Sequence, residues 1–471
     1  MLKELRQKLD SREIGACELT KEYLKKIKTD NCNSFITVCE NEALKSAEIA
    51  QKRIDEGNSG ALTGIAVSIK DNICTKGIKT TCASKMLEDY VPVYDADVVE
   101  KLKSENAVII GKTNMDEFAM GGSSQTSYFG GVKNPHDPQR VTGGSSGGAA
   151  ASVAAGLVPA ALGSDTGGSV RQPSSFCGVV GLKPGYGRVS RYGLIAFASS
   201  LDQIGPIATT AEDTGIILNA VAGESKHDMT SISTDKEDFT AKCGLSMRGV
   251  KIGLPKEFFA KEIDAEVAKS VTDAARELEK AGAELVECSL PSLEYAVSAY
   301  YLISSAEAAS NLARFDGVKY GHRSENGDSF KELIENSRSE GFGKEVKNRI
   351  LLGNYALSSG YYDAYYKNAT RIRAQIKAEY KEIFSKCSAI ITPTAPTTAY
   401  KIGYQEHDSV KMYMSDICTV CANISGLPSI SVPCGKDSEG MPIGMSITGK
   451  MLDEAYIIGI ADCYEKIVKG E

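Results

Sequence analysis

The chain contains no tryptophan and only four histidines among its 471 residues. No histidine lies in the glycine- and serine-rich segment 143–184 or beside Lys70, the two regions in which candidate catalytic groups gather. A serine nucleophile needs a base that removes its proton, and histidine is the most common one. The lack of histidine in these regions therefore directs attention to lysine as the base.

The chain also lacks an excess of positive charge and any long uncharged apolar run. Its formal net charge of −7 argues against a main role in holding a nucleic-acid backbone. No apolar run reaches the length that a membrane-spanning helix needs. The first residues, MLKELRQKLDSREIG, alternate charged and apolar side chains, unlike a secretory signal. We therefore expect a cytoplasmic protein that does not bind a membrane.

Thirteen cysteines are scattered along the chain, and this odd number fits a reducing compartment better than a disulfide framework. One CxxC pair, Cys418 and Cys421, has no second pair and no histidine beside it. Small core residues are a better interpretation of this pair than a zinc or redox site. We expect no metal on this chain.

The hydrophobic pattern predicts an α/β fold with helices on both faces of a sheet. Strand patterns alternate with helical ones along much of the chain, which is typical of such a sheet. Strands are expected at 65–69, 107–110, 158–162, 250–254, 283–286, 389–392 and 429–432. The expected segments are 1–55 (N-terminal helices), 56–222 (α/β core), 223–247 (polar surface connection), 248–294 (continuation of the core), 295–385 (helical insertion) and 386–471 (C-terminal strands and a helix).

Two serines lie in glycine-rich turns, Ser145 in GGSSGG and Ser169 in DTGGS, and Lys70 ends the strand pattern 65–69. A lysine with its ordinary pKa is protonated at pH 7. Lowering that pKa from about 10.4 to about 7 costs roughly 4–5 kcal/mol, which burial in a dry site can supply. We therefore expect Lys70 to be enclosed and to act as the base.

These three side chains can form a proton relay. Ser145 can bridge Lys70 and Ser169, because a hydroxyl donates and accepts hydrogen bonds at once. The glycines around Ser145 permit an unusual backbone, a cis bond after Gly144 included. We therefore expect acyl transfer by a Ser-Ser-Lys relay.

The turn before Ser169 can direct several backbone N–H groups at one point, which is the geometry of an oxyanion hole. Asp165 and Arg171 flank this turn and are placed to brace it. The expected oxyanion donors are Thr166, Gly167 and Gly168.

Simpler interpretations exist for each fragment, since glycine and serine clusters are most often only loops. The sequence GKT at 111–113 resembles the end of a phosphate-binding loop, but Asn106 stands where the first glycine is required. A strand end with an exposed Lys112 is the expected interpretation. A nucleotide-binding or assembly protein without chemistry of its own is therefore disfavoured, because the ordered lysine and two serines are more specific.

Segment 143–184, including its tail SFCGVVGLKP, resembles the amidase signature family at nearly every fixed position, and Lys70 in GIAVSIKDNI matches as well. The resemblance implies a large mixed sheet covered by helices on both faces, with a helical insertion. It also implies that Ser169 is the acyl-ester nucleophile, that Ser145 and Lys70 relay its proton, and that the substrate is an amide.

Three further segments resemble the branch of this family that supplies ammonia to a tRNA-dependent amidotransferase. They are residues 305–321, 345–369 and 412–432. The branch implies glutamine as substrate, with Arg349 matching the carboxylate-binding position, Asp416 the ammonium-binding position, and Tyr300 a substrate-side segment of open role. Without the resemblance, a surface arginine, a helix-capping aspartate and a core tyrosine are the simpler interpretations.

The same branch implies a heterotrimer with partner subunits B and C. One partner would use ATP and Mg²⁺ to amidate Glu-tRNA(Gln), so this chain would carry no cofactor. A free-standing amidase with another amide substrate stays open as the alternative. The tyrosine-rich stretch 355–366 is expected to pack at a core or subunit interface, with stacking on nucleic-acid bases as the less favoured interpretation.

Overall fold

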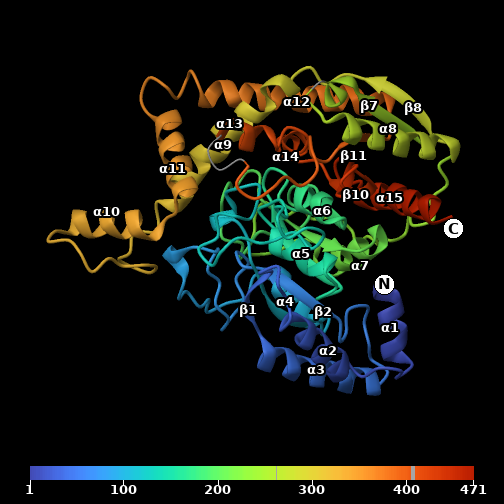
Figure 1. Cartoon of the computed structure of the whole chain (residues 1–471), viewed down its shortest axis with the longest axis horizontal. Coiled ribbons are helices and arrows are strands. Elements are labelled where there is room, and N and C mark those ends of the chain that lie inside the picture. Colours follow the sequence, from blue (N-terminus) through green and yellow to red (C-terminus); the bar gives the residue numbers. More distant parts are fainter. Residues whose placement is uncertain (261, 405–408, 471) are drawn as a thin grey trace.

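The computed structural model describes residues 1–260, 262–404 and 409–470, which fold around an eleven-stranded sheet (Figure 1). Residues 261, 405–408 and 471, in the expected segments 248–294 and 386–471, lie outside the described residues. The strands follow the order β1-β3-β2-β4-β6-β5-β10-β11-β9-β7-β8. Their bounds are β1 Phe35–Val38, β2 Ala66–Lys70, β3 Val108–Thr113, β4 Ala160–Asp165, β5 Val180–Lys183, β6 Gln203–Ala208, β7 Lys251–Pro255, β8 Glu284–Cys288, β9 Ala389–Pro393, β10 Ser429–Lys436 and β11 Pro442–Gly449.

Helices cover the sheet and form a separate group at one end of the molecule (Figure 1). The α-helices are α1 Leu2–Asp10, α2 Ala16–Ile27, α3 Glu40–Asp55, α4 Asp97–Ser104, α5 Gly147–Ala154, α6 Arg171–Cys177, α7 Ala211–Val221, α8 Ala265–Lys280, α9 Leu293–Leu312, α10 Phe330–Gly341, α11 Lys344–Leu357, α12 Tyr366–Lys386, α13 Ser409–Met414, α14 Val420–Ser425 and α15 Glu454–Lys469. Short 3-10 turns are η1 Lys85–Leu87, η2 Glu117–Ala119 and η3 Lys256–Phe259. None of the helices in the described part of the chain has the length and apolar character that crossing a lipid bilayer requires.

The sheet is mixed, as expected. Parallel pairs join β3, β2 and β4 at one end and β9, β7 and β8 at the other, while antiparallel pairs connect the strands between them. Strands β2 to β6 are buried at every position, whereas the edge strands β1 and β8 are partly exposed. Burial on both faces requires helices on both sides. The predicted fold class is therefore confirmed.

Two glycines of β11 show how closely the helices approach the two faces. A Cβ at Gly444 would lie 2.5 Å from Ser175 Oγ of α6, and a Cβ at Gly449 would lie 2.6 Å from Ile457 of α15. The two positions are an odd number of residues apart, so they point to opposite faces. Helix α6, which follows Ser169 in sequence, thus packs on the face opposite α15.

The expectation that residues 1–55 are all helical is wrong at one place. The strand β1 (Phe35–Val38) lies between α2 and α3 and pairs antiparallel with β3. This four-residue strand is held by β3, which comes much later in the sequence, so its local pattern carries little strand signal. Strands β5, β6 and β11 were not expected either, and each contains a glycine that weakens the strand pattern.

The expectation that Lys112 is exposed is also wrong. Its side chain is completely buried, because β3 lies inside the sheet between β1 and β2. The Lys112 Nζ donates to the carbonyl of Ile73 at 2.8 Å and to Thr80 Oγ1 at 2.6 Å, and lies 3.6 Å from Asp71 Oδ1. This lysine therefore has no access to a phosphate, which removes the phosphate-loop interpretation.

The buried pair of Lys112 and Asp71 gives a stability prediction. Lys112→Met should lower the free energy of unfolding by about 3 kcal/mol, since it leaves a buried carboxylate without its cation. The double variant Lys112→Met/Asp71→Asn should regain most of this loss. Urea unfolding of the three proteins measures both effects, and equal losses in the single and double variants would contradict the pairing.

Candidate active site

The ends of the parallel neighbours β2 and β4 bring Lys70 and Asp165 to the same edge of the sheet. Their register pairs Val67 with Ala160 and Ile69 with Leu162. Ligands of α/β sheets commonly bind at the carboxyl ends of parallel strands. The two serine-bearing loops meet at this edge, one before α5 and the other between β4 and α6.

The amine of Lys70 lies at the centre of the site and is completely buried. Its Nζ lies 2.8 Å from Ser145 Oγ, 2.8 Å from Ser146 Oγ and 3.2 Å from the carbonyl oxygen of Ser164. The peptide bond between Gly144 and Ser145 is cis. The expected contact between Lys70 and Ser145 is therefore present, and Ser146 joins it.

Burial, and not the hydrogen bonds, makes the neutral amine of Lys70 accessible near pH 7. Ser146 Oγ donates to the carbonyl of Ser164 at 3.1 Å, so it accepts a hydrogen from Lys70. The amine also donates to Ser145 Oγ and to the carbonyl of Ser164. Burial lowers the pKa of Lys70 to about 7, against the pull of Asp116 and other carboxylates.

Ser169 stands beside this cluster in the loop between β4 and α6. Its carbonyl accepts the N–H of Ser146 at 3.1 Å, and its residue surface is 8% exposed. In the described part of the chain, the hydroxyls of Ser145 and Ser169 are not hydrogen-bonded directly to each other. Contacts of this kind commonly tighten when a substrate binds. The contact between Ser169 and the lysine cluster is therefore a main-chain hydrogen bond to Ser146.

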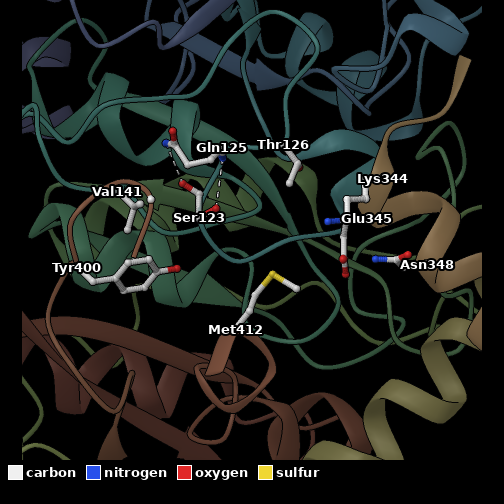
Figure 2. Close-up of a pocket in the computed structure, with 10 residues that line it drawn as sticks. Ser123, Gln125, Thr126, Val141, Lys344, Glu345, Asn348, Tyr400 and Met412 are labelled. Atoms are coloured by element: carbon white, nitrogen blue, oxygen red, sulfur yellow. Dashed lines mark hydrogen bonds between the residues drawn. The ribbon is translucent and has the colours of Figure 1, made fainter. Parts of the chain in front are cut away.

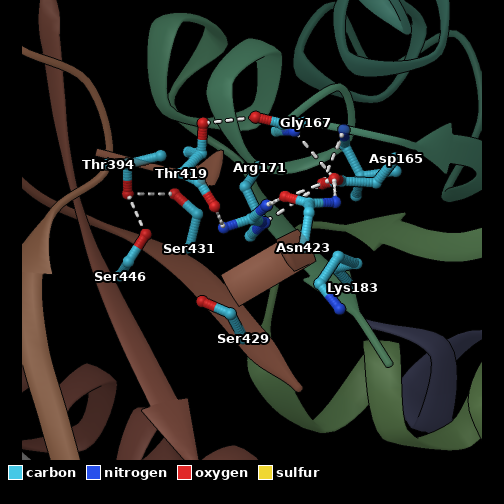
Figure 3. Close-up of polar contacts among 12 residues, drawn as sticks. Asp165, Gly167, Arg171, Lys183, Thr394, Thr419, Asn423, Ser429, Ser431 and Ser446 are labelled. Carbon is cyan, nitrogen blue, oxygen red and sulfur yellow. Dashed lines mark hydrogen bonds and ion pairs between the residues drawn. The ribbon is translucent and has the colours of Figure 1, made fainter. Parts of the chain in front are cut away.

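The loop that carries Ser169 is held by a buried ion pair (Figure 3). Asp165 accepts the N–H groups of Gly168 at 2.8 Å and Val170 at 3.2 Å, and it pairs with Arg171 through two hydrogen bonds of 3.0 and 3.2 Å. Asn423 Nδ2 donates to the same carboxylate at 2.8 Å. Burial acts to raise the pKa of Asp165, but the Arg171 guanidinium outweighs it and lowers that pKa to about 2.

This arrangement changes the expected oxyanion hole. The N–H of Gly168 is bound to Asp165 and is not free for a substrate oxygen. No acceptor within the described chain is recorded for the N–H groups of Thr166 and Gly167. Thr419 Oγ1 donates to the Gly167 carbonyl at 2.5 Å and fixes that peptide. Thr166 and Gly167 are therefore the available donors.

Neighbouring tyrosines of α9 contact both halves of the site. A Cβ at Gly167 would lie 2.5 Å from Tyr300 Oη, so the Tyr300 ring packs directly on the nucleophile loop. The next residue, Tyr301, donates its hydroxyl hydrogen to Asp416 Oδ2 at 2.6 Å. Helix α9 thus connects the nucleophile loop with Asp416.

Arg349 of α11 is the nearby cation. Its guanidinium lies over the rings of Tyr301 at 4.4 Å and Tyr413 at 4.9 Å, and its Nε donates to Glu345 at 2.6 Å. Burial acts to lower the pKa of Arg349, but the charges of its neighbours outweigh this effect and raise it. Arg349 is thus a permanent positive charge, with 2% of its side chain exposed.

Asp416 supplies the opposite charge on the other side of Tyr301. Burial raises its pKa to about 7, and the hydrogen bond from Tyr301 acts against this rise. A cationic group that reaches Asp416 would lower that pKa again. A buried cation and a titratable carboxylate, separated by a tyrosine, match the two charges of a free amino acid.

A cavity of about 300 Å³ opens beside these groups (Figure 2). It is bordered by Glu345, the partner of Arg349, and by the loop 123–126 that precedes the serine motif. Tyr400 and Met412 close the opposite side (Figure 2). Glu345 connects this cavity with Arg349, because the Nε of Arg349 donates to it.

The tyrosine-rich stretch 355–366 does not pack in the core. The side chains of Tyr355, Tyr361, Tyr362 and Tyr365 are exposed at the turn between α11 and α12. The rings of Tyr355, Tyr361 and Tyr365 contact one another, and Tyr362 stacks on Tyr366. The described structure thus excludes core packing and places these rings on the surface.

Sequence reasoning missed three residues of the site. Ser146 was visible as the second serine of GGSSGG, and Tyr301 as the neighbour of Tyr300. Glu345 precedes Arg349 by one helical turn, a spacing that predicts an ion pair but says nothing about a binding site.

Comparisons with known proteins agree with this geometry. The sequence profile of the family described as Amidase matches residues 18–458. The A subunit of glutamyl-tRNA(Gln) amidotransferase from Ruminiclostridium cellulolyticum is 56% identical over 467 residues, which are 98% of this chain and 96% of the relative. The protein of the same name from Caldanaerobacter subterraneus subsp. tengcongensis is 53% identical, covering 99% of this chain and 96% of the relative.

Solved structures give the same result. The crystal structure of the A subunit of glutamyl-tRNA(Gln) amidotransferase from Thermotoga maritima matches with a TM-score of 0.81 at 42% identity, covering 96% of this chain and 91% of that chain. A bacterial aryl acylamidase of the amidase signature family has a TM-score of 0.86 over 99% of this chain and 96% of its own. At 23% identity, the acylamidase shows only that the fold is shared.

The lysine cluster predicts how Ser169 reacts with a fluorophosphonate probe that labels activated serines. Labelling should rise with pH through a midpoint near 7, because only the neutral amine of Lys70 accepts a proton. Lys70→Met should lose labelling by at least about a hundredfold. Mass spectrometry of the labelled peptide gives the rates, with Ser169→Ala as the blank. A flat rate between pH 6 and 8.5 would contradict this role of Lys70.

Proposed function

The chain belongs to the amidase family, and we propose that within it this protein hydrolyses glutamine for an amidotransferase that converts Glu-tRNA(Gln) to Gln-tRNA(Gln). The observation that carries the proposal is the placement of Arg349 and Asp416 around Tyr301, next to the loop of Ser169. Glutamine has a carboxylate for the arginine, an ammonium group for the aspartate and an amide for the serine. The names of the relatives support the same reaction.

The first half of the reaction forms an acyl ester. Lys70 takes the proton of Ser145, and Ser145 takes the proton of Ser169 as the Ser169 oxygen attacks the carboxamide carbon. The carbon–nitrogen bond then breaks, and ammonia leaves with the proton that returns along the relay. The products of this half are ammonia and a γ-glutamyl ester on Ser169.

The second half restores the enzyme. Water attacks the ester carbon while the relay accepts the proton of the water, and the bond to Ser169 breaks with that proton returned to its oxygen. The sum is glutamine plus water giving glutamate plus ammonia. In both halves the carbonyl oxygen gains negative charge, and the N–H groups of Thr166 and Gly167 are the donors that stabilise it.

Binding of glutamine uses the two charged residues. The guanidinium of Arg349 presents its Nη1 and Nη2 edge to the carboxylate, since its Nε is bound to Glu345. The ammonium group of the substrate pairs with Asp416 and favours the ionised carboxylate. Tyr300 packs on Gly167 and lies edge-on to Tyr301, so its ring lies between the nucleophile loop and Tyr301.

The fate of the ammonia belongs to a complex. Ammonia would pass to a partner that activates Glu-tRNA(Gln) with ATP and Mg²⁺, in a heterotrimer with subunits B and C. The net charge of −7 supports a division of labour in which the partner binds most of the tRNA. Thirteen free cysteines support a reducing, cytoplasmic location.

Replacing the nucleophile separates the two activities of the complex. In a complex reconstituted with its partner subunits, Ser169→Ala should reduce glutamine-dependent formation of Gln-tRNA(Gln) at least about a thousandfold. Formation from added ammonium chloride should persist, because the partner's step needs no acyl ester. The rates are measured with charged tRNA and ATP.

Ser174→Ala is the matched control, since Ser174 lies in α6, directly after the loop of Ser169, and its hydroxyl donates to the carbonyl of Val170. Its glutamine-dependent rate should stay within about twofold of the wild type. Loss of both activities in Ser169→Ala would contradict the ammonia model. Rapid hydrolysis of simple amides by the isolated chain would favour a free-standing amidase.

A further inference from the structure

Glu117 is a buried carboxylate that the reaction described above does not use. It is 3% exposed, and within the described chain no ion pair to it is recorded. The hydroxyl of Ser84 donates to Oε1, and the N–H of Gly343 donates to Oε1 at 3.1 Å and to Oε2 at 2.9 Å. Burial raises the pKa of Glu117 to about 7, and these hydrogen bonds act against the rise. Burying a carboxylate without a paired cation is unfavourable, so its position in the fold calls for a structural or functional reason.

Its partner Gly343 is the N-cap residue of α11, which has no side-chain cap of its own. In a capping box, a Glu at the third helical position reaches back to the N-cap N–H. That position holds Val346 here, and Glu117 supplies the carboxylate from another part of the chain. The positive end of the helix dipole favours a negative charge at this point. Glu117 thus caps α11 from outside.

Helix α11 carries the residues that face the proposed substrate. Arg349 follows Gly343 by six residues, which is about 9 Å along the helix axis. Glu345, which binds the Nε of Arg349, lies in the first turn itself. A shift of the helix start therefore moves the guanidinium and its partner together.

Asp116, the residue before Glu117, holds the loops near the catalytic serines in a similar way. Asp116 accepts the N–H of Ser124 at 2.9 Å and the hydroxyl of Thr126 at 2.9 Å, and its carboxylate fills the space where a Cβ at Gly144 would lie. Asp116 and Glu117 are consecutive, so one short segment contacts both the serine loop and the start of α11. The two neighbouring carboxylates thus connect the serine loop with the start of α11.

From this arrangement we propose that Glu117 is a positioning residue for substrate recognition: it holds the start of α11 so that Arg349 meets the substrate carboxylate. The inference rests on the proposed function, because it assumes that Arg349 binds glutamine. Loss of Glu117 should weaken glutamine binding and leave the acylation chemistry at Ser169 nearly intact. The expected signature is a rise in KM with little change in kcat.

The test is a set of glutamine saturation curves measured on the complex with its partner subunits. Glu117→Ala should raise KM for glutamine about five- to tenfold, with kcat within about threefold of the wild type. Glu117→Gln keeps an acceptor oxygen without the charge and should raise KM about two- to threefold. Arg349→Met sets the upper limit, with a rise of at least about a hundredfold.

Glu465 offers a matched control elsewhere in the fold. Its carboxylate, whose pKa burial also raises to about 7, accepts the N–H of Ala211 at 3.2 and 3.1 Å at the start of α7. Helix α7 carries none of the candidate site residues. Glu465→Ala should therefore lower the melting temperature and leave KM within about twofold of the wild type.

The outcomes separate the two proposals. Wild-type complex without glutamine hydrolysis would contradict the proposed function itself. An active wild type with an unchanged KM in Glu117→Ala, or with an equal rise in Glu465→Ala, would overturn the positioning role. If Glu117→Ala does not fold, Gly343→Ala disturbs the same contact from the exposed side, since its Cβ would overlap Glu117 Oε2. A normal KM in that variant would also overturn the role.

Discussion

The amine of Lys70 is buried among hydroxyl and carbonyl oxygens and has no carboxylate within ion-pair distance in the described structure, and the chemistry of the site depends on this environment. Lys112, on the neighbouring strand, is equally buried but lies 3.6 Å from Asp71, which favours its charge. Two lysines on adjacent strands thus receive different surroundings. Lys112 is suited to stabilise the fold, and Lys70 is suited to accept a proton in a site without histidine.

The placement of the serines around this amine depends on contacts between distant parts of the chain. The ion pair of Asp165 and Arg171 fixes the nucleophile loop, and Asn423 completes it from the C-terminal segment. Tyr301 and Arg349 come from the helices between these segments. The helices α9 and α11 therefore pack beside the serine motif: α9 supplies Tyr300 and Tyr301, and α11 supplies Arg349.

Strand patterns and glycine turns are local signals, and they were sufficient to predict an α/β sheet and the contact of Lys70 with Ser145; the family resemblance implied that the sheet is mixed. The sequence was not sufficient to predict that the N–H of Gly168 is bound to Asp165, since that depends on how the turn closes. The burial of Lys112 and the cap provided by Glu117 depend on neighbours far along the chain. Local patterns thus pointed to the candidate reacting groups, and tertiary contacts determine how these groups are held.

The amine of Lys70 can be titrated directly by NMR on protein labelled with carbon-13 at the lysine Cε. A resonance that disappears in Lys70→Met should titrate near pH 7, far below the ordinary lysine pKa of about 10.4. Lys183→Arg identifies the resonance of a further buried lysine, whose pKa burial also lowers to about 7. A Lys70 resonance that titrates above about pH 9.5 would contradict a neutral lysine as the base of the relay.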